Sequence, residues 1–280
     1  MERFEFVAGI PDVFVKEKVE ELLKEIPTKY IWGGSYGHFL FFSDKEIEEY
    51  RNFLEENGLQ IEQIHCIFGG DYDFSIPDEN KRAVIVESTK SALIKLGKVK
   101  VKNFVIHCSG IIDENEKKER IKIFIDSLSR ILPVAEKTGI KIAIENVSSS
   151  QNVIGTAEEI MEILEKFNSP YLGVCFDTGH ANLTGRFKEE FLILKDKIFT
   201  FHIHDNDGKR DLHLPPVMGT IDWKWFVKEL KKSNYSGQLP LEIVIPECSS
   251  WKEIISNMEK LFENDGEGEF SYCNRIIKMV

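Results

Sequence analysis

The sequence contains few cysteines, and their placement excludes two common structural uses of that residue. Its five cysteines (Cys66, Cys108, Cys175, Cys248 and Cys273) stand singly, and no Cys-x-x-Cys pair occurs. A zinc ribbon needs such pairs, and a disulfide framework would use an even number of cysteines. We therefore expect free thiols in a reducing compartment.

Long apolar runs are missing as well. No stretch of the 280 residues approaches the roughly 20 consecutive apolar residues of a membrane span. The first residues, MERFEFVAGIPD, carry charges inside their apolar run and lack the small-residue cleavage site of a secretory signal. We therefore expect a cytoplasmic protein without membrane association.

Positive charge is not in excess. Lys and Arg number 36 against 47 Asp and Glu, which gives a net charge of −11. This balance gives no general support for a surface that coats nucleic acid, although a local basic groove is compatible with it. A metal site rich in carboxylates would itself add to the acidic count.

No Gly-x-Gly-x-x-Gly motif follows the first predicted strand, so a dinucleotide-binding fold has no support there. Instead, short apolar runs alternate with amphipathic stretches along the whole chain. The predicted strands are Glu5–Gly9, Lys29–Gly33, Ile61–Cys66, Lys102–His107, Lys141–Glu145, Leu172–Phe176, Phe199–Ile203 and Pro240–Val244. The predicted helices are Lys16–Ile26, Asp44–Asn57, Glu79–Leu96, Asn115–Lys137, Thr156–Phe167, Phe187–Lys195, Trp223–Lys231 and Trp251–Phe262.

This alternation indicates a parallel sheet with right-handed crossovers, and eight strands favour a closed barrel over an open sheet. We predict an α/β fold consisting of a single (β/α)8 TIM barrel domain over residues 1–280. The segments Cys66–Asn80 and Asp205–Ile221 are long, as is typical of loops on the catalytic face of such a barrel. The tail after Glu263 has no interpretable pattern.

Six consecutive predicted strands place a histidine or a carboxylate near that catalytic face. Five stand at the strand ends and one, Glu242, stands early in its strand; the set is His65, His107, Glu145, Asp177, His202 and Glu242. All six are metal-ligand residue types. Without a cation, such a ring would bury several like charges at a large desolvation cost. The pattern therefore predicts a divalent-metal site.

Two shorter patterns extend this set of ligands. Asp177 and His180 stand three residues apart across the turn that leaves the sixth strand. Asp211 and His213 stand two residues apart in the seventh loop. In contrast, His38 is interpreted as a loop histidine without a ligand role.

Strand alternation gives each cysteine near the ligands a predicted position. If the histidines face the barrel axis, Cys66 and Cys108 point the opposite way, under the helices. Cys175 shares its parity with Asp177 and should lie one layer deeper inside the barrel. We interpret these three thiols as packing residues.

The segments around these residues resemble the xylose-isomerase-like TIM-barrel superfamily, which includes sugar-phosphate isomerases and epimerases and also endonuclease IV. The resemblance is carried by IHCIF (64–68), VIHCSG (105–110), IAIENV (142–147), GVCFDTGHAN (173–182), FHIHDNDGKRDLHLPPVMGTIDW (201–223) and PLEI (240–243). These segments run through nearly the whole barrel after the second strand. As a set they are specific for the superfamily and less specific for any one activity.

The resemblance implies two alternative ligand sets for a divalent metal. In ketose-epimerase-like members, two Glu, one Asp and one His hold one Mn, Co or Mg ion, and the matching residues are Glu145, Asp177, His202 and Glu242. In endonuclease IV, nine residues hold three zinc ions, and the matching residues are His65, His107, Glu145, Asp177, His180, His202, Asp211, His213 and Glu242. The implied cofactor is therefore Mn, Co, Mg or Zn, with one to three ions.

The sequence also departs from endonuclease IV. That family typically has a His-Ala/Pro-Tyr-like segment and an Asp-Thr-Cys-His segment, which here read HCIF (65–68) and DTGH (177–180). The seventh loop is closer to the sugar-isomerase pattern, apart from a glycine that is replaced around Val217 and Met218.

We therefore hypothesise that the protein is a metal-dependent isomerase or epimerase of a sugar or sugar phosphate that works through a cis-enediolate. The metal would polarise the carbonyl oxygen, and the catalytic residues Glu145 and Glu242 would move the carbon-bound proton. Either glutamate is a candidate for the base. Candidate substrate-binding residues are His204, Lys209, Arg210 and Trp32.

The alternative is a zinc-dependent phosphoesterase acting on abasic DNA, which would use all nine ligand types. The sequence shows no clustered basic run interleaved with aromatics that would grip a duplex. A third class, a non-catalytic binding barrel, would retain the ligand ring without using it. The expected partner is a small sugar, or nucleic acid under the alternative; the resemblance also allows a homo-oligomer, by analogy alone.

Overall fold

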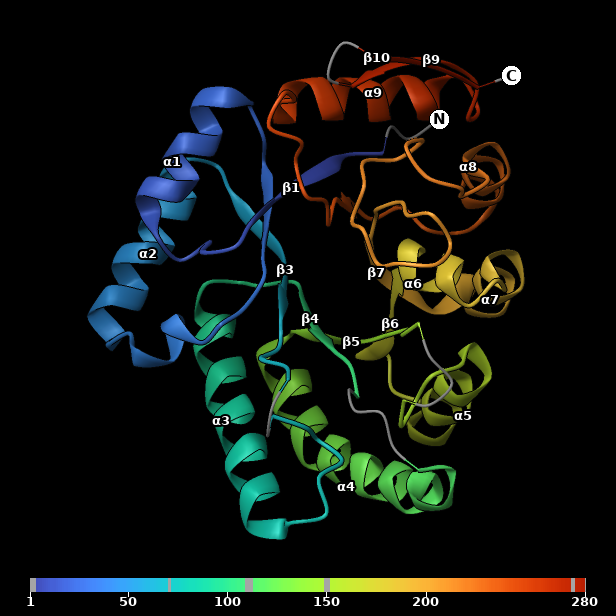
Figure 1. The fold of residues 1–280 in the computed structure, drawn as a ribbon. Helices are drawn as coiled ribbons and strands as arrows, with labels where there is room; N and C mark the ends of the chain where they lie inside the picture. Colours follow the sequence, from blue (N-terminus) through green and yellow to red (C-terminus); the bar gives the residue numbers. More distant parts are fainter. Residues whose placement is uncertain (1–3, 70–71, 109–112, 149–151, 273–274, 280) are drawn as a thin grey trace.

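Eight parallel strands form a barrel in the computed structural model, which describes residues 4–69, 72–108, 113–148, 152–272 and 275–279 (Figure 1). The order of the strands in the sheet is β7-β6-β5-β4-β3-β2-β1-β8. A parallel bridge between Ile203 and Leu241 joins the two ends of this sheet, and Ile203 N donates to Pro240 O at 2.9 Å. The strands are β1 (Phe6–Ile10), β2 (Tyr30–Gly33), β3 (Gln60–His65), β4 (Asn103–Ile106), β5 (Lys141–Glu145), β6 (Leu172–Asp177), β7 (Ile198–His202) and β8 (Leu239–Pro240). The predicted (β/α)8 barrel is confirmed.

The helices surround the strands and connect them (Figure 1). They are α1 (Lys16–Glu25), α2 (Asp44–Glu56), α3 (Glu79–Lys98), α4 (Glu114–Thr138), α5 (Ala157–Phe167), α6 (Thr178–Leu183), α7 (Phe187–Leu194), α8 (Trp223–Lys232) and α9 (Trp251–Glu263), with short 3₁₀ turns η1 (His38–Phe41) and η2 (Lys195–Lys197). Ser43 and Thr156 each form a capping box with the glutamate three residues later, which fixes the starts of α2 and α5. Among the helices described, none combines the length and apolarity that a membrane crossing requires.

For all strands except β8, the observed bounds differ from the predicted ones by at most one residue at either end, and those of β5 are identical. That strand was predicted over Pro240–Val244, but it covers only Leu239–Pro240, because it pairs with β1 at two residues and meets β7 through a single bridge. Glu242 therefore lies beyond the end of β8 and not early within it. The sequence also gave no sign of helix α6 or of the hairpin β9 (Gly268–Tyr272) and β10 (Arg275–Met279), which contacts α9.

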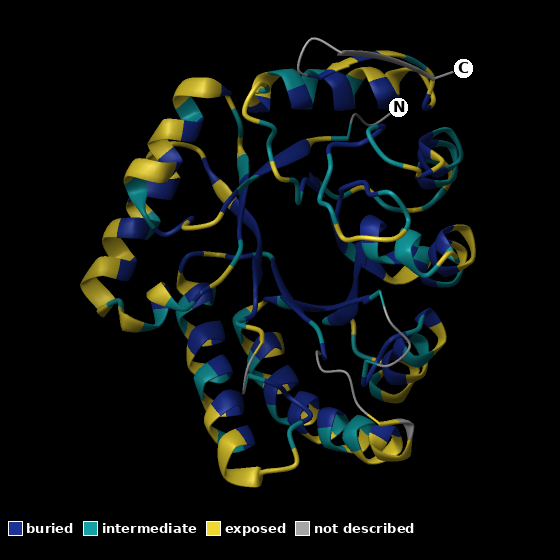
Figure 2. Ribbon diagram, in the orientation of Figure 1, coloured by how far each residue is buried: buried dark blue, intermediate teal, exposed yellow. Residues whose placement is uncertain are grey.

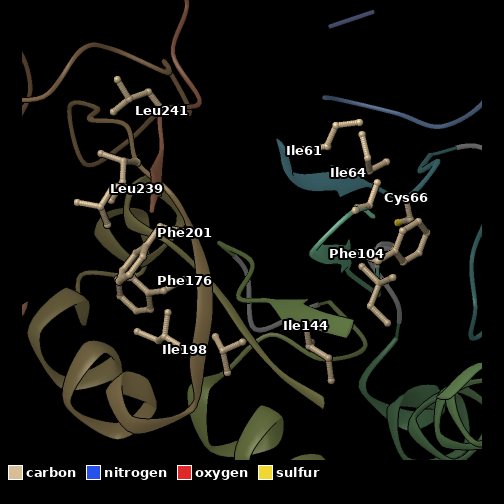
Figure 3. Close-up of a cluster of buried hydrophobic side chains, with 14 of the residues drawn as sticks. Ile61, Ile64, Cys66, Phe104, Ile144, Phe176, Ile198, Phe201, Leu239 and Leu241 are labelled. Atoms are coloured by element: carbon tan, nitrogen blue, oxygen red, sulfur yellow. The ribbon is translucent and has the colours of Figure 1, made fainter. Parts of the chain in front are cut away.

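The main core lies between the sheet and the helices (Figure 2 and Figure 3). Outward-facing strand side chains such as Ile64, Phe104 and Phe201 are fully buried there. A separate, smaller cluster made of Val105, Ala143 and Cys175 packs with Phe199 inside the barrel. The interior is thus filled below the level of the strand ends, so any ligand site is confined to the mouth.

The cysteines test two predictions. Cys66 and Cys108 belong to the outer core and Cys175 to the inner cluster, so their predicted packing positions are confirmed. The expectation of free thiols is correct for these three and wrong for Cys248, which is disulfide-bonded. Single spacing along the chain does not prevent two cysteines from meeting in the fold. Cys273 lies outside the described residues.

A buried ion pair fixes the loop between β3 and α3. The Arg120 guanidinium, on α4, donates to the Asp73 carboxylate and, through Nε, to Ser75 O at 2.6 Å. Ser127, also on α4, donates to Phe74 O at 2.6 Å. The loop that follows His65 is therefore held against α4 by side chains and backbone together.

Candidate metal centre

Four ligand-type side chains converge where strands β5 to β8 end. His202 Nδ1 lies 3.1 Å from Glu145 Oε1, 3.1 Å from Glu242 Oε2 and 3.7 Å from Asp177 Oδ2. One ligand atom from each of the four residues lies within 4.8 Å of the other three, which suits the ligands of a single cation. The four residues that the resemblance assigns to one ion therefore meet in the structure.

A second group forms on the other oxygen of the same carboxylate. His65 Nε2 lies 3.0 Å from Glu145 Oε2, and the rings of His65 and His107 are 5.1 Å apart. The ligand atoms of His65, His107 and Glu145 also lie within 4.8 Å of one another. Glu145 is thus placed between two groups of ligands.

A third group gathers around Asp211 in the loop between β7 and α8. Asp211 Oδ2 lies 3.4 Å from His180 Nε2 and 3.2 Å from His213 Nε2. His180 Nδ1 in turn lies 3.4 Å from Glu145 Oε1, which connects this group to the first. All nine predicted ligands therefore belong to one continuous cluster.

The hydrogen bonds of three histidines show that this cluster fits a cation. The Nδ1 atoms of His65, His180 and His213 lie 2.7, 3.0 and 2.9 Å from the backbone oxygens of Cys66, Asn146 and Glu242. Because a carbonyl only accepts, each Nδ1 carries a proton, and the neutral ring then presents a lone pair at Nε2. Each Nε2 faces a carboxylate, so a proton or a metal ion is required between them. This arrangement is typical of metal-binding histidines.

The electrostatics of the cluster point the same way. Burial opposes protonation of His65, but its contacts with Cys66 and Glu145 outweigh burial and raise its pKa to about 10. Burial likewise opposes ionisation of Glu242, but His202 outweighs it and lowers the pKa of Glu242 to about 2. The pKa of Glu145 is held well below its usual range by His202, His180 and His65, again against burial. These carboxylates are thus ionised at neutral pH, and a nearby cation, either a protonated histidine or a metal ion, is needed to stabilise them.

Some buried ring nitrogens also lack a partner. His107 Nδ1 and His204 Nδ1 make no hydrogen bond within the described part of the chain. A buried nitrogen without a partner costs about 1–3 kcal/mol. The residues present therefore fit a divalent metal, both in donor types and in unmet bonding capacity.

Two residues that the sequence reasoning missed hold the ligands in place. Asn146 accepts from Asp177 N at 2.7 Å and donates to Asp177 O at 3.0 Å, so it fixes the end of β6. The buried Asp205 accepts from Gly219 N at 3.0 Å and Trp223 Nε1 at 2.7 Å, which closes the long loop that carries Asp211. The Glu-Asn pair at the end of β5 was the available signal for Asn146.

His204 was predicted to contact the substrate, but it is not among the residues that line the cavity over the cluster. It is fully buried, its Nε2 lies 3.0 and 3.1 Å from the two oxygens of Asp177, and its ring stacks on His213 at 4.2 Å. Gly179 makes room for it, because an added Cβ would lie 1.9 Å from His204 Cε1. His204 thus lies against the candidate ligand Asp177, and one of its ring nitrogens also lies within 4.8 Å of ligand atoms of His213 and Glu242.

The other predicted substrate contacts have different surroundings. A cavity of about 450 Å³ lies over the cluster and is lined by residues that include Glu145, His180 and Glu242. Neither Lys209 nor Arg210 belongs to this lining; both are exposed, and Arg210 is paired with Asp207 at 2.7 Å. Trp32 stacks on His202 at 5.6 Å and lines an adjacent cavity.

The family profile described as "Xylose isomerase-like TIM barrel" matches residues 31–262. The chain belongs to this family. An uncharacterized protein of Methanocaldococcus jannaschii is 31% identical over 209 residues, which cover 72% of this chain and 70% of that protein. Inosose isomerase of Bacillus subtilis is 28% identical over 183 residues, covering 62% and 65%. A probable endonuclease 4 of Mycoplasmopsis pulmonis is 24% identical over 177 residues, covering 60% and 64%.

Several solved structures have a similar fold. A D-tagatose 3-epimerase-like protein has a TM-score of 0.77 and 24% identity, covering 93% of this chain and 96% of its own. The 3-keto-D-glucoside 4-epimerase of E. coli has a TM-score of 0.75 and 18% identity, covering 92% and 99%. The IolI protein, solved with a bound zinc atom, has a TM-score of 0.75 and 21% identity, covering 94% and 98%. At these identities the structures show the shared barrel fold.

Proposed function

We propose that the protein is a divalent-metal-dependent isomerase or epimerase of a small sugar or sugar derivative. The observation that carries this proposal is the placement of Glu145 and Glu242, each 3.1 Å from the same nitrogen of His202 in a pocket of about 450 Å³. Two carboxylates so placed can act on the two faces, or on neighbouring carbons, of one small molecule. The sugar isomerase and epimerases among the similar proteins support the same class of reaction.

Glu145, Asp177, His202 and Glu242 would hold the metal, as their common spacing allows. When bound, a divalent ion supplies Lewis-acid polarisation of the carbonyl oxygen next to the reacting carbon. One of the two glutamates removes the proton from that carbon, and a cis-enediolate forms. The same or the other glutamate then returns a proton, to the neighbouring carbon for isomerisation or to the opposite face for epimerisation.

Both glutamates have a pKa below the usual range of a carboxyl group. Because each is ionised at neutral pH, each can accept a proton without first losing one. The rings of Trp32 and Phe68 contact the ligand cluster, at 5.6 Å from the ring of His202 and 5.0 Å from the ring of His65. These apolar walls limit the access of water to the reacting carbon.

The test is proton exchange at the carbon next to the carbonyl. The metal-loaded protein is incubated in D₂O with a panel of aldoses, ketoses and keto sugars, and loss of the proton signal is followed by NMR. We expect exchange with at least one sugar, and a loss of about 10³-fold in Glu145→Gln and Glu242→Gln. The matched control is Glu190→Gln, which alters an equally buried glutamate on α7, remote from the pocket lining. Full exchange in Glu145→Gln would contradict the mechanism.

A second candidate is a multi-zinc phosphoesterase acting on abasic DNA. One observation favours it. Two further groups of candidate ligands come together in the structure, one around His65 and His107 and one around Asp211, although a one-metal isomerase does not require them. The probable endonuclease 4 proteins among the relatives agree with it. Cleavage of a duplex with a single abasic site, and three zinc ions per chain, would support this candidate. An intact duplex at high protein concentration would exclude it.

A further inference from the structure

A second cavity opens beside the metal pocket. It has a volume of about 340 Å³, and Gly34, His213 and Glu242 line both this cavity and the metal pocket, so the two cavities adjoin. Apart from these shared residues its walls are mostly apolar, and they include Ile10, Trp32, Leu241, Ile243, Val244 and Trp251. We call this cavity the side pocket.

Four backbone groups in the segment that follows β8 and lines the side pocket are already paired. Leu241 O accepts from Trp32 Nε1 at 3.2 Å, and Leu241 N donates to Val7 O at 2.9 Å. Glu242 O accepts from His213 Nδ1, and Val244 N donates to His213 O at 2.8 Å. A polar ligand group that entered here would lose its hydration with little replacement, whereas an apolar group would gain by leaving water.

The described lining of the metal pocket contains three carboxylates and four histidines, His65, His107, His180 and His213. The carboxylates are Glu145, Asp211 and Glu242, and no lysine or arginine is among the described lining residues. The sequences of segments 70–71, 109–112 and 149–151, which follow β3, β4 and β5, also contain no lysine or arginine. Phosphoryl groups are usually bound by such residues.

We propose that the substrate is an uncharged sugar derivative with an apolar substituent, and that the side pocket binds this substituent. This inference rests on the proposed function for the polar part of the substrate. The metal centre would hold the oxygens of the sugar, while an aryl or alkyl group would extend past Gly34 along Trp32 and Val244. Sugar phosphates, which lack such a group and carry two negative charges, are then poor substrates.

Binding and turnover of a matched pair of probes test the assignment. The probes are the methyl and phenyl β-D-glycosides of 3-ketoglucose, with 6-phosphorylated methyl glycoside as the charged probe. Binding to the Mn²⁺-loaded protein is measured by calorimetry, and proton exchange by NMR in D₂O. We expect the phenyl glycoside to bind about 30-fold more tightly than the methyl glycoside, because a ring leaves water. The phosphorylated probe should bind at least about 10-fold more weakly than its parent.

Two aspartate variants separate the side pocket from general effects of added charge. Val244 is 67% exposed at the edge of the side pocket, and Val84, on α3, is 70% exposed. In Val244→Asp the preference for the phenyl glycoside should fall from about 30-fold to below about 3-fold, while Val84→Asp should keep it. Equal binding of both glycosides to the unaltered protein, or a full preference in Val244→Asp, would overturn the assignment.

The two readouts distinguish the failure of this inference from failure of the proposed function. Proton exchange with the methyl glycoside but no preference for the phenyl group would refute the side pocket and leave the isomerase proposal intact. A binding preference that Val244→Asp removes, without exchange in any probe or in any sugar of the panel above, would support the side pocket and refute the isomerase proposal.

Discussion

Replacing Gly179 by alanine separates what helix propensity predicts from what the packing of the site predicts. Gly179 is the second residue of α6, and an alanine in a helix is about 1 kcal/mol more favourable than a glycine. The structure predicts the opposite sign. An added Cβ would lie 1.9, 2.4 and 2.6 Å from three atoms of the His204 ring, far inside contact distance.

The ring has little space to retreat, because His213 stacks on it at 4.2 Å with an angle of 10° between the planes. Overpacking of this kind costs about 1–3 kcal/mol, and displacement of His204 also removes its hydrogen bond to the Asp177 carboxylate, worth about 1.5–3 kcal/mol. We expect a net loss of about 2–4 kcal/mol in the free energy of unfolding. Because His204 orients a predicted metal ligand, metal affinity should also fall by about 10- to 100-fold.

Urea unfolding of the metal-free protein and a chelator competition measure these two effects. Gly37→Ala is the matched control: Gly37 has helical angles (φ −51°, ψ −45°), and its added Cβ would meet no atom closer than 3.7 Å. The double variant Gly179→Ala with His204→Ala should be less destabilised than the sum of the single variants by at least about 1 kcal/mol, because the clash disappears. A Gly179→Ala protein as stable as Gly37→Ala, with unchanged metal affinity, would refute the reasoning.

Three further outcomes are expected. Burial raises the pKa of Glu62 to about 7 despite the nearby Lys102, so the folded state keeps a proton that the unfolded state releases near pH 4.5. The free energy of unfolding should therefore fall by about 3 kcal/mol as pH rises from about 4.5 to 7. If urea unfolding of Glu62→Gln shows the same dependence of this free energy on pH as the unaltered protein, the prediction is wrong. Arg120→Ala leaves the buried Asp73 without its cation and should lower the free energy of unfolding by about 3 kcal/mol in urea titrations. The control Arg51→Ala removes a more exposed arginine and should lower it by about 0.5 kcal/mol or less. Equal losses in the two variants would disprove the role of the buried pair. EDTA should abolish proton exchange in sugars, and added Mn²⁺ should restore it; exchange that survives EDTA would speak against a metal-dependent reaction.

The strand ends, and the convergence of the candidate ligands that stand at them, could be predicted because both depend on short-range patterns. A strand buried on both faces reads as an apolar run, and in a parallel barrel all strands end on one face. It follows that a histidine or carboxylate at each end, such as His65, Glu145 and His202, must meet the others. The candidate ligands at the strand ends therefore needed only the order of the strands, whereas His180, Asp211 and His213, which lie outside the strands, depended on their own spacing and on the family resemblance.

The remaining features depend on contacts between distant segments. The shortness of β8 results from its limited pairing with β1, which no local pattern around Pro240 reveals. The buried position of His204 depends on the space that Gly179 leaves and on the ring of His213, on two other segments. The bond of Cys248 likewise required the folded chain, since spacing alone suggested a free thiol.

The measurement that tests the central claim most directly is the metal content of the purified protein per chain, compared with that of Glu145→Gln. We predict at least one divalent ion per chain in the unaltered protein, because Glu145, Asp177, His202 and Glu242 each offer one ligand atom and these four atoms lie within 4.8 Å of one another. Glu145→Gln should retain less than about a tenth of this content after dialysis. An unaltered protein that binds no divalent metal, even after reconstitution with Mn²⁺, Co²⁺, Mg²⁺ and Zn²⁺, would contradict the account.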